Sequence, residues 1–555
     1  MGIRLPEGGL FIWIHSNEVR NLRIIVSTTR HFLLVVCALL VGSSTVLVRA
    51  QETDLSFLTT RAERTGFLET TRYDELIGFL EVATAQNPRL HLTSFGYSSE
   101  GRSLPLVIFG DVSDTSPSAI RATGRVRVYI QGNIHAGEVC GKEALLMMIR
   151  DLASGRYAAW ADSLVLMLAP IYNVDGNERI SLMNRRRQNG PYGGMGQRPN
   201  AQGLDLNRDH MKVKSPEARS LIRLMNEYDP HVLVDLHTTN GTQHAYHITY
   251  SPPLNPNTAP EISSFLRGNM LPEITRIIQE KHGWDYYYYG NLPFRQGAEP
   301  GWYTFDHRPR FNNNYVGLRN RIAILSEAYA YASFEDRIRA SLYFVEEILN
   351  YSHAHAMDVR RVVEEASAKS VVGEQLAVRS DYERSPEEVD ILMGETHTIA
   401  HPFSGEMVRV RGEAQRTERM FEYGTFTATE SERVPARYYV PPRAEIVREY
   451  LDIHGIEYRE SSADEPLIVQ SFTIDSTSVS PRIFQDIRER TVYGSYVSTE
   501  KELESGTLVV PVDQQLGRLI FYLLEPRSDD GLVNWAQMDA FIETGGEYPI
   551  YRSID

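Results

Sequence analysis

Residues 125–139 have the sequence RVRVYIQGNIHAGEV, in which an apolar run passes directly into a turn that contains His135 and Glu138. The first eight residues predict a β-strand, and the apolar spacing of residues 141–152 predicts a helix after the turn. His135 and Glu138 therefore stand between a strand and a helix. A histidine and a carboxylate three residues apart in such a turn can bind one metal ion, and zinc accepts both kinds of ligand.

A second predicted strand, HVLVDLH at 231–237, ends in a further candidate ligand, His237. In open α/β sheets, ligands bind at the carboxyl ends of the strands. With 16 histidines in the chain, one His-x-x-Glu pattern alone would be weak evidence. Two strand ends that both offer metal ligands are more than composition predicts, so the three residues together indicate a metal site.

The chain around these turns alternates predicted strands and helices. Apolar runs at 162–172 and 321–329 predict two more strands, and the spacing at 216–228 predicts a helix. This order predicts an α/β domain built on a largely buried sheet, which we assign to residues 51–355. A charged helical stretch followed by short strands and turns then predicts a C-terminal α+β domain at 356–555, where no motif indicates a chemistry.

Composition excludes some classes of protein. The 555 residues are too many for one small module, and 42% hydrophobic with 23% charged residues is typical of a folded chain. Acidic residues outnumber basic ones by 72 to 57, which gives a net charge of −15. This balance is poor for binding a phosphate backbone, so we expect no nucleic-acid partner.

The first fifty residues differ from the rest. A mostly apolar stretch at 32–48 follows several arginines and leads to Val48-Arg49-Ala50, a small-x-small pattern that suits signal peptidase. We expect residues 1–50 to be a secretory signal, and the protein to be periplasmic or secreted with no stable membrane span after cleavage. An uncleaved N-terminal anchor is the alternative, because the stretch is near the lower length limit for a spanning helix. Beyond the leader only Cys140 remains, so no intrachain disulfide is expected.

Two further segments carry polar residues that could act on a substrate. In GLDLNR at 203–208, Arg208 offers a planar fork that matches a carboxylate, and Asn207 offers a neutral donor. Glu327 follows an apolar run, where a carboxylate is costly unless it is satisfied or used; beside a metal-bound water it could be a general base. The simpler alternatives are a surface ion pair for Arg208 and a solvated Glu327.

Taken in order, these segments resemble the zinc metallocarboxypeptidases of the carboxypeptidase A type, peptidase family M14. The resemblance covers roughly residues 60–350 and rests on GYSSEGRSLPLVIFG (96–110), NIHAGEV, YNVDGNER, LDLNRD, DLHTTNG and LSEAY. It implies the fold of that family, a mixed twisted sheet flanked by helices. It also implies an enzyme that hydrolyses C-terminal peptide bonds, with the C-termini of peptides or proteins as substrates.

The resemblance implies roles for the metal and the base. His135, Glu138 and His237 would bind one Zn²⁺, and Asp205 would hold the second ring nitrogen of a ligand histidine. Glu327 would accept the proton of the zinc-bound water and pass it to the leaving amine.

It also implies roles on the substrate side. Asn207 and Arg208 would bind the C-terminal carboxylate of the peptide. An arginine would stabilise the oxyanion, and we favour Arg185 over its neighbours Arg186 and Arg187, although the spacing does not choose among them.

Some alternatives stay open. A tyrosine upstream of the glutamate would cap the substrate; Tyr315 and Tyr303 both qualify, and we favour Tyr315. A zinc amidase acting on cell-wall peptides or acylated amino acids could use the same ligands. A metal-retaining binding protein without turnover is a further alternative, against which Glu327 argues.

Overall fold

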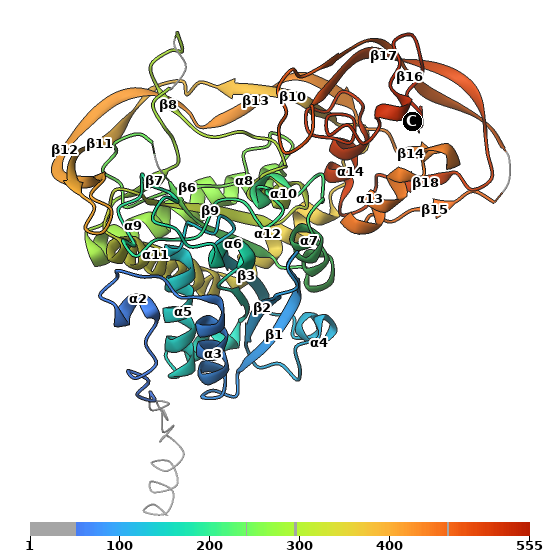
Figure 1. The fold of residues 1–555 in the computed structure, drawn as a ribbon. Helices are drawn as coiled ribbons and strands as arrows, with labels where there is room; N and C mark the ends of the chain where they lie inside the picture. The colour runs from blue at the N-terminus through green and yellow to red at the C-terminus, as the bar shows by residue number, and fades with distance from the viewer. Residues whose placement is uncertain (1–51, 240, 294–296, 463–464, 555) are drawn as a thin grey trace, which may run out of the picture. The chain divides into compact units, whose positions relative to one another are not determined.

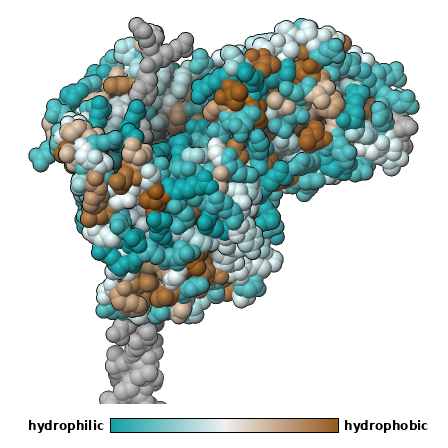
Figure 2. All heavy atoms as spheres, in the orientation of Figure 1, coloured by the Kyte–Doolittle hydropathy of each residue, from teal (hydrophilic) through white to brown (hydrophobic). Residues whose placement is uncertain are grey.

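The computed structural model describes residues 52–239, 241–293, 297–462 and 465–554 (Figure 1). The predicted leader, residues 1–50, lies outside the described residues. Among those described, no helix combines the length and the apolar character needed to cross a membrane. The face of the molecule in Figure 2 is largely hydrophilic, with apolar residues in scattered groups.

Residues 90–329 contain an eight-stranded mixed sheet, in the order β1-β2-β4-β3-β5-β9-β6-β7. The four strands β4, β3, β5 and β9 run parallel in the middle, whereas β2 and β6 pair antiparallel with β4 and β9. The bounds are β1 (Leu90–Tyr97), β2 (Ser103–Phe109), β3 (Val126–Gly132), β4 (Leu164–Ala169), β5 (Val232–Thr239), β6 (Ile248–Ser251), β7 (Tyr286–Tyr288) and β9 (Ile322–Tyr329). The predicted mixed sheet is confirmed, and the four strands predicted from apolar runs are β3, β4, β5 and β9.

Helices cover the sheet and fix its strand ends. Helix α5 packs against β3 and β5, α11 packs against α5 and β9, and α7 packs against β1. Gly141 lets α5 approach β5 closely, because a Cβ at this position would lie 2.5 Å from Cβ of Leu236. The larger helices are α3 (Tyr73–Thr84), α5 (Cys140–Ala153), α7 (Pro216–Tyr228), α9 (Leu271–His282), α10 (Asn312–Leu318), α11 (Phe334–Ala354) and α12 (Ala356–Ala368). The helices predicted at 141–152 and 216–228 are α5 and α7.

Residues after α12, yellow to red in Figure 1, are rich in strands, as predicted for the C-terminal part. The expectation of short strands is wrong: β12 has 17 residues and β16 has 15. Charged residues alternate along β12 and many are exposed, so its sequence lacks the continuous apolar face that marks a long strand. The division of the chain at residue 355 stays a prediction.

The elements of this part form hairpins and a smaller sheet. Strand β10 pairs with β13, β11 pairs with β12, and β16 pairs with β17, all antiparallel. Strand β12 also pairs with the short β8, which lies between β7 and β9 in sequence. The bounds are β8 (Trp302–Tyr303), β10 (Gln375–Glu383), β11 (Glu388–Ala400), β12 (Met407–Tyr423), β13 (Thr425–Arg433), β14 (Arg437–Val440), α13 (Ile446–His454), β16 (Glu465–Val479), β17 (Arg490–Leu503), β18 (Leu508–Pro511) and α14 (Gly517–Leu524).

Candidate metal centre and substrate pocket

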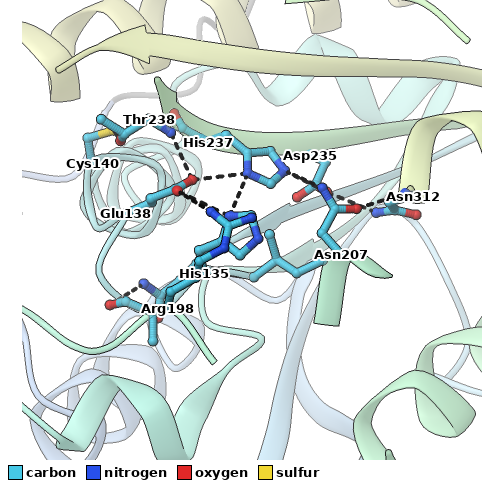
Figure 3. A network of polar contacts seen from close by, with 12 residues as sticks. His135, Glu138, Cys140, Arg198, Asn207, Asp235, His237, Thr238 and Asn312 are labelled. Carbon is cyan, nitrogen blue, oxygen red and sulfur yellow. Dashed lines mark hydrogen bonds and ion pairs between the residues drawn. The ribbon is translucent and has the colours of Figure 1, made fainter. Parts of the chain in front are cut away.

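Three buried side chains from two strand ends meet in one cluster (Figure 3). His135 lies in the turn after β3, Glu138 lies just before α5, and His237 lies near the end of β5. The Nδ1 atoms of the two histidines are 3.3 Å apart, and they lie 3.1 and 3.0 Å from the two carboxylate oxygens of Glu138. The structure therefore brings the three sequence-predicted ligands together.

Each imidazole ring is held on its far side by a carboxylate. Nε2 of His135 is 3.0 Å from Oδ1 of Asp205, and Nε2 of His237 is 3.0 Å from Oδ2 of Asp235. A carboxylate on one ring nitrogen favours a proton there and leaves the other nitrogen free as a metal ligand. Asp235 was not predicted, although its position two residues before His237 places both on one face of the strand.

The cluster fits zinc. Zinc bonds of about 2.0–2.2 Å in a tetrahedron place ligand atoms about 3.3–3.6 Å apart, close to the 3.0–3.3 Å separations here. Two histidines and one carboxylate leave a fourth position for water, the arrangement of a catalytic zinc site. Burial alone would raise the pKa of Glu138, but His135 and Arg185 outweigh it and hold this pKa well below its usual range. Glu138 is therefore charged, as a ligand must be.

Glu327 lies next to the cluster on the neighbouring strand. It is the register partner of His237 across β5 and β9 and lines the same cavity. Its Oε2 is buried and has no hydrogen-bond partner among the described residues. Burial raises the pKa of Glu327 to about 8. An unpartnered carboxyl oxygen beside a metal cluster is a candidate for proton transfer.

Arg208 and Asn207 lie on the wall of this cavity, in a short turn that follows Asp205. The guanidinium of Arg208 stacks on Phe311 at 3.8 Å from the ring centre and donates to the carbonyl oxygen of Asn207 at 2.7 Å. Within the described ranges no carboxylate forms an ion pair with Arg208, so the structure does not show the surface ion pair considered above. Burial lowers the pKa of Arg208 to about 10, which leaves it cationic at neutral pH.

The three neighbouring arginines occupy different positions. Nη2 of Arg185 lies 2.5 Å from Oε1 of Glu138, and its side chain lines the cavity. Arg186 and Arg187 are exposed, and Arg186 pairs with Glu406. Arg198 also lines the cavity, with Nη2 at 2.8 Å from Oδ2 of Asp205. Sequence reasoning missed Arg198, which stands in a loop where no motif or periodicity marks it.

The predicted substrate-capping position of Tyr315 needs correction. Tyr315 is fully buried in α10, where its hydroxyl lies 2.7 Å from Nδ1 of His454, and it does not line the cavity. Every residue of α10 is buried, so Tyr315 lies in the core and not on the wall of the cavity. Tyr303 lines a neighbouring pocket instead, and Tyr289 is the tyrosine that lines the metal cavity. Tyr289 is the last of four consecutive tyrosines, of which the first three form β7. This run was not used to predict the site from the sequence.

Comparisons with known proteins agree with this geometry. Residues 76–291 match the family model of zinc carboxypeptidase, Peptidase_M14. Carboxypeptidase 2 of Trichophyton rubrum is 22% identical, with 87% of this chain and 86% of that protein covered. Mouse carboxypeptidase D is 31% identical over 26% of this chain and 12% of its own length.

Solved structures of carboxypeptidases are also similar. Carboxypeptidase A from Helicoverpa armigera is 17% identical with a TM-score of 0.39, covering 52% of this chain and 75% of its own. The metallo-carboxypeptidase from Burkholderia cenocepacia is 15% identical with a TM-score of 0.37, covering 51% and 70%. Residues 76–291 are therefore similar to the zinc carboxypeptidase domain of peptidase family M14, a family of metallocarboxypeptidases, and the curated relatives carry carboxypeptidase names.

Proposed function

We propose that the protein is an exported zinc carboxypeptidase that removes residues from the free C-termini of peptides. One observation carries this proposal: a three-donor cluster, an unpartnered oxygen of Glu327 and the guanidinium of Arg208 share one cavity. The predicted leader at residues 1–50 supports export.

His135, Glu138 and His237 would hold the metal, while Asp205 and Asp235 would keep the two rings in the orientation that presents Nδ1. When bound, zinc would lower the pKa of a coordinated water to about 7 and polarise the carbonyl of the scissile bond. The five side chains are buried or nearly so, which would exclude bulk water from the reacting atoms.

Glu327 and Arg185 would act on different groups during the reaction. Glu327 would act on a proton of the attacking water, and Arg185 on the carbonyl oxygen of the substrate. Among the described residues Oε2 of Glu327 has no competing partner. With a dication held beside it, the pKa of Glu327 would fall below the raised value of about 8, and the ionised carboxylate would accept the proton of the attacking water and return it to the leaving amine. Arg185 would donate to the carbonyl oxygen of the substrate as negative charge develops there.

Asn207 and Arg208 would select a peptide end. Stacking on Phe311 and the bond to the carbonyl of Asn207 fix the plane of the guanidinium, and its remaining N–H groups can donate to both oxygens of a carboxylate. A buried cation would favour a free C-terminus over an amidated one, which makes the activity that of an exopeptidase.

A mass-spectrometric time course tests this function. Residues 51–555 are incubated with peptide pairs that differ only in a free or an amidated C-terminus, with and without a chelator. We expect stepwise loss from free ends only, abolished by the chelator and restored by zinc. Trimming of amidated peptides at the same rate, or trimming that persists in the chelator, would contradict the proposal.

Substitution of Arg208 tests the carboxylate role in the same assay. Arg208→Ala removes charge-assisted hydrogen bonds, so kcat/KM on free C-termini should fall about 10- to 100-fold. The matched control is Arg186→Ala; Arg186 is exposed and forms an ion pair with Glu406, and its removal should change kcat/KM less than about twofold. Equal effects of the two substitutions would remove Arg208 from substrate recognition.

A further inference from the structure

A second pocket adjoins the metal cavity. It has a volume of about 500 Å³ and shares Tyr289 and Phe305 with the metal cavity. Its other walls come from Tyr303, the last residue of the short strand β8, and from Asp381 and Tyr382 on β10. We call it the aromatic pocket. Strand β10 lies outside the segment that matches the zinc carboxypeptidase family, so this pocket is built in part by the C-terminal region.

The rings of the aromatic pocket hold one another in place. Tyr303 stacks on Tyr423 with ring centres 4.1 Å apart. The rings of Tyr303 and Tyr382 pack edge-on, with their centres 5.4 Å apart. The hydroxyl of Tyr382 donates to the carbonyl oxygen of Thr304 at 3.0 Å. Phe305 packs edge-on against Tyr289 at 5.3 Å. The walls are therefore fixed before any ligand binds, and ring faces are what a positive charge approaches favourably.

The two pockets differ in the charged side chains that line them. Arg185, Arg198 and Arg208 line the metal cavity. In contrast, Asp381 is the charged residue of the aromatic pocket, and among its described lining residues none is basic. Oδ1 of Asp381 accepts the backbone N–H of Tyr382, and Asp381 takes part in no ion pair between described residues. An unpaired carboxylate beside several aromatic rings is complementary to a cation.

The position of the aromatic pocket indicates which part of a peptide reaches it. Neither Asn207 nor Arg208 lines it, and neither do the three metal ligands. The side chain of the last residue shares its Cα with the carboxylate and so stays near Arg208. A residue on the N-terminal side of the scissile bond is the one that extends past Tyr289 and Phe305 toward Asp381.

We propose that the aromatic pocket binds a lysine or arginine side chain that precedes the scissile bond in the peptide substrate. The cation lies against the rings of Tyr303 and Tyr382 and pairs with Asp381. This inference rests on the proposed carboxypeptidase function, because the carboxylate held by Arg208 sets the register of the peptide.

Peptide competition tests the inference. Peptides with one fixed, cleavable C-terminal residue carry lysine, norleucine, phenylalanine or glutamate at each of the two preceding positions. We expect kcat/KM for lysine to exceed that for norleucine about tenfold at one position, and this ratio to fall as salt screens Asp381. Asp381→Asn should reduce the ratio at least about threefold and leave kcat/KM for the norleucine peptide within about twofold.

The control variant is Asp390→Asn, which removes the same charge from an exposed residue of β11 outside both pockets and should leave the ratio unchanged. Tyr382→Leu should lower the ratio as well, since it removes one ring. A preference for norleucine or phenylalanine over lysine, or a ratio that Asp381→Asn does not change, would overturn the inference and leave the carboxypeptidase function standing. Failure to trim any peptide would overturn the proposed function and the inference together.

Discussion

Two sides of the cavity are supported by different parts of the chain. The metal side holds His135, Glu138 and His237, and the proposed substrate side holds Asn207 and Arg208. On the metal side, Asp235 stands two residues before His237 in the same strand, and Asp205 stands behind His135. These supports come from the parallel sheet and the loop beside it. The substrate side depends on the 304–312 segment, which places Phe311 under Arg208. That segment is held by residues that follow it by up to 224 positions.

The contacts on the 304–312 segment come largely from the C-terminal part. Arg310 is buried, and its Nη2 lies 2.7 Å from both Oδ1 of Asp530 and Oε1 of Glu489. Nε2 of His307 lies 3.1 Å from Oδ2 of Asp529. Because the two supports differ, we expect the proposed metal binding and the proposed peptide recognition to be lost independently, although their residues line one cavity.

The largest effect is expected at the base. Glu327→Gln keeps the size of the side chain but removes its capacity to accept a proton, so kcat should fall about 10²- to 10⁴-fold. Zinc content, measured by atomic emission, should stay at one ion per chain, because Glu327 is not among the three cluster residues. Glu388→Gln, at an exposed position, serves as the control and should leave kcat unchanged. Unchanged turnover would remove Glu327 from the chemistry.

On the substrate side, Arg310→Met should give the largest loss of stability. It leaves Asp530 buried without its cation, and removal of one partner from a buried pair costs about 3–5 kcal/mol in the free energy of unfolding. Urea unfolding measures this loss. The double variant Arg310→Met with Asp530→Leu should recover part of it, since no uncompensated charge remains on Asp530.

Arg310→Met also tests whether the metal side and the substrate side can be lost independently. Zinc affinity of folded Arg310→Met should stay within about threefold, while KM for free C-termini rises, because Phe311 no longer supports Arg208. A loss of zinc affinity as large as the loss of substrate affinity would show that the two sides are not separable.

On the metal side, Asp235→Asn should weaken zinc without changing the ligands. The amide cannot hold the proton on Nε2 of His237 as the carboxylate does, and loss of such a support costs about 10- to 100-fold in metal affinity. Competition with a chromogenic chelator measures the dissociation constant. Affinity equal to that of the unaltered protein would show that the strand alone orients His237.

Sequence predicted the metal side better than the substrate side for a physical reason. A strand and the turn after it fix where His135, Glu138 and His237 point, so local pattern was sufficient to predict that they meet. Asp235 could have been found by the same logic, from the period of two along β5. Arg198 could not, because a loop position depends on tertiary contacts.

The misplaced Tyr315 shows where local reasoning fails. Residues 312–318 form a helix that is buried on every side, and no hydrophobic stripe in the sequence distinguishes a face toward the substrate from a face toward the core. The partner of Tyr315, His454, follows it by more than a hundred residues. The four parallel strands of the eight-stranded sheet were predictable from apolar runs, whereas the long exposed hairpins after residue 375 were not.

The smallest expected effect concerns a contact that links the two sides. The backbone N–H of Asp205, the support of His135, donates to Oε1 of Gln485 in the loop between β16 and β17 at 2.8 Å. Gln485→Ala removes one neutral hydrogen bond, worth about 0.5–1.5 kcal/mol. Because Asp205 keeps its bonds to His135 and Arg198, zinc affinity should change less than about threefold. The chelator competition used for Asp235→Asn measures it, and a tenfold loss for Gln485→Ala would mean that the C-terminal part supports the metal side as well.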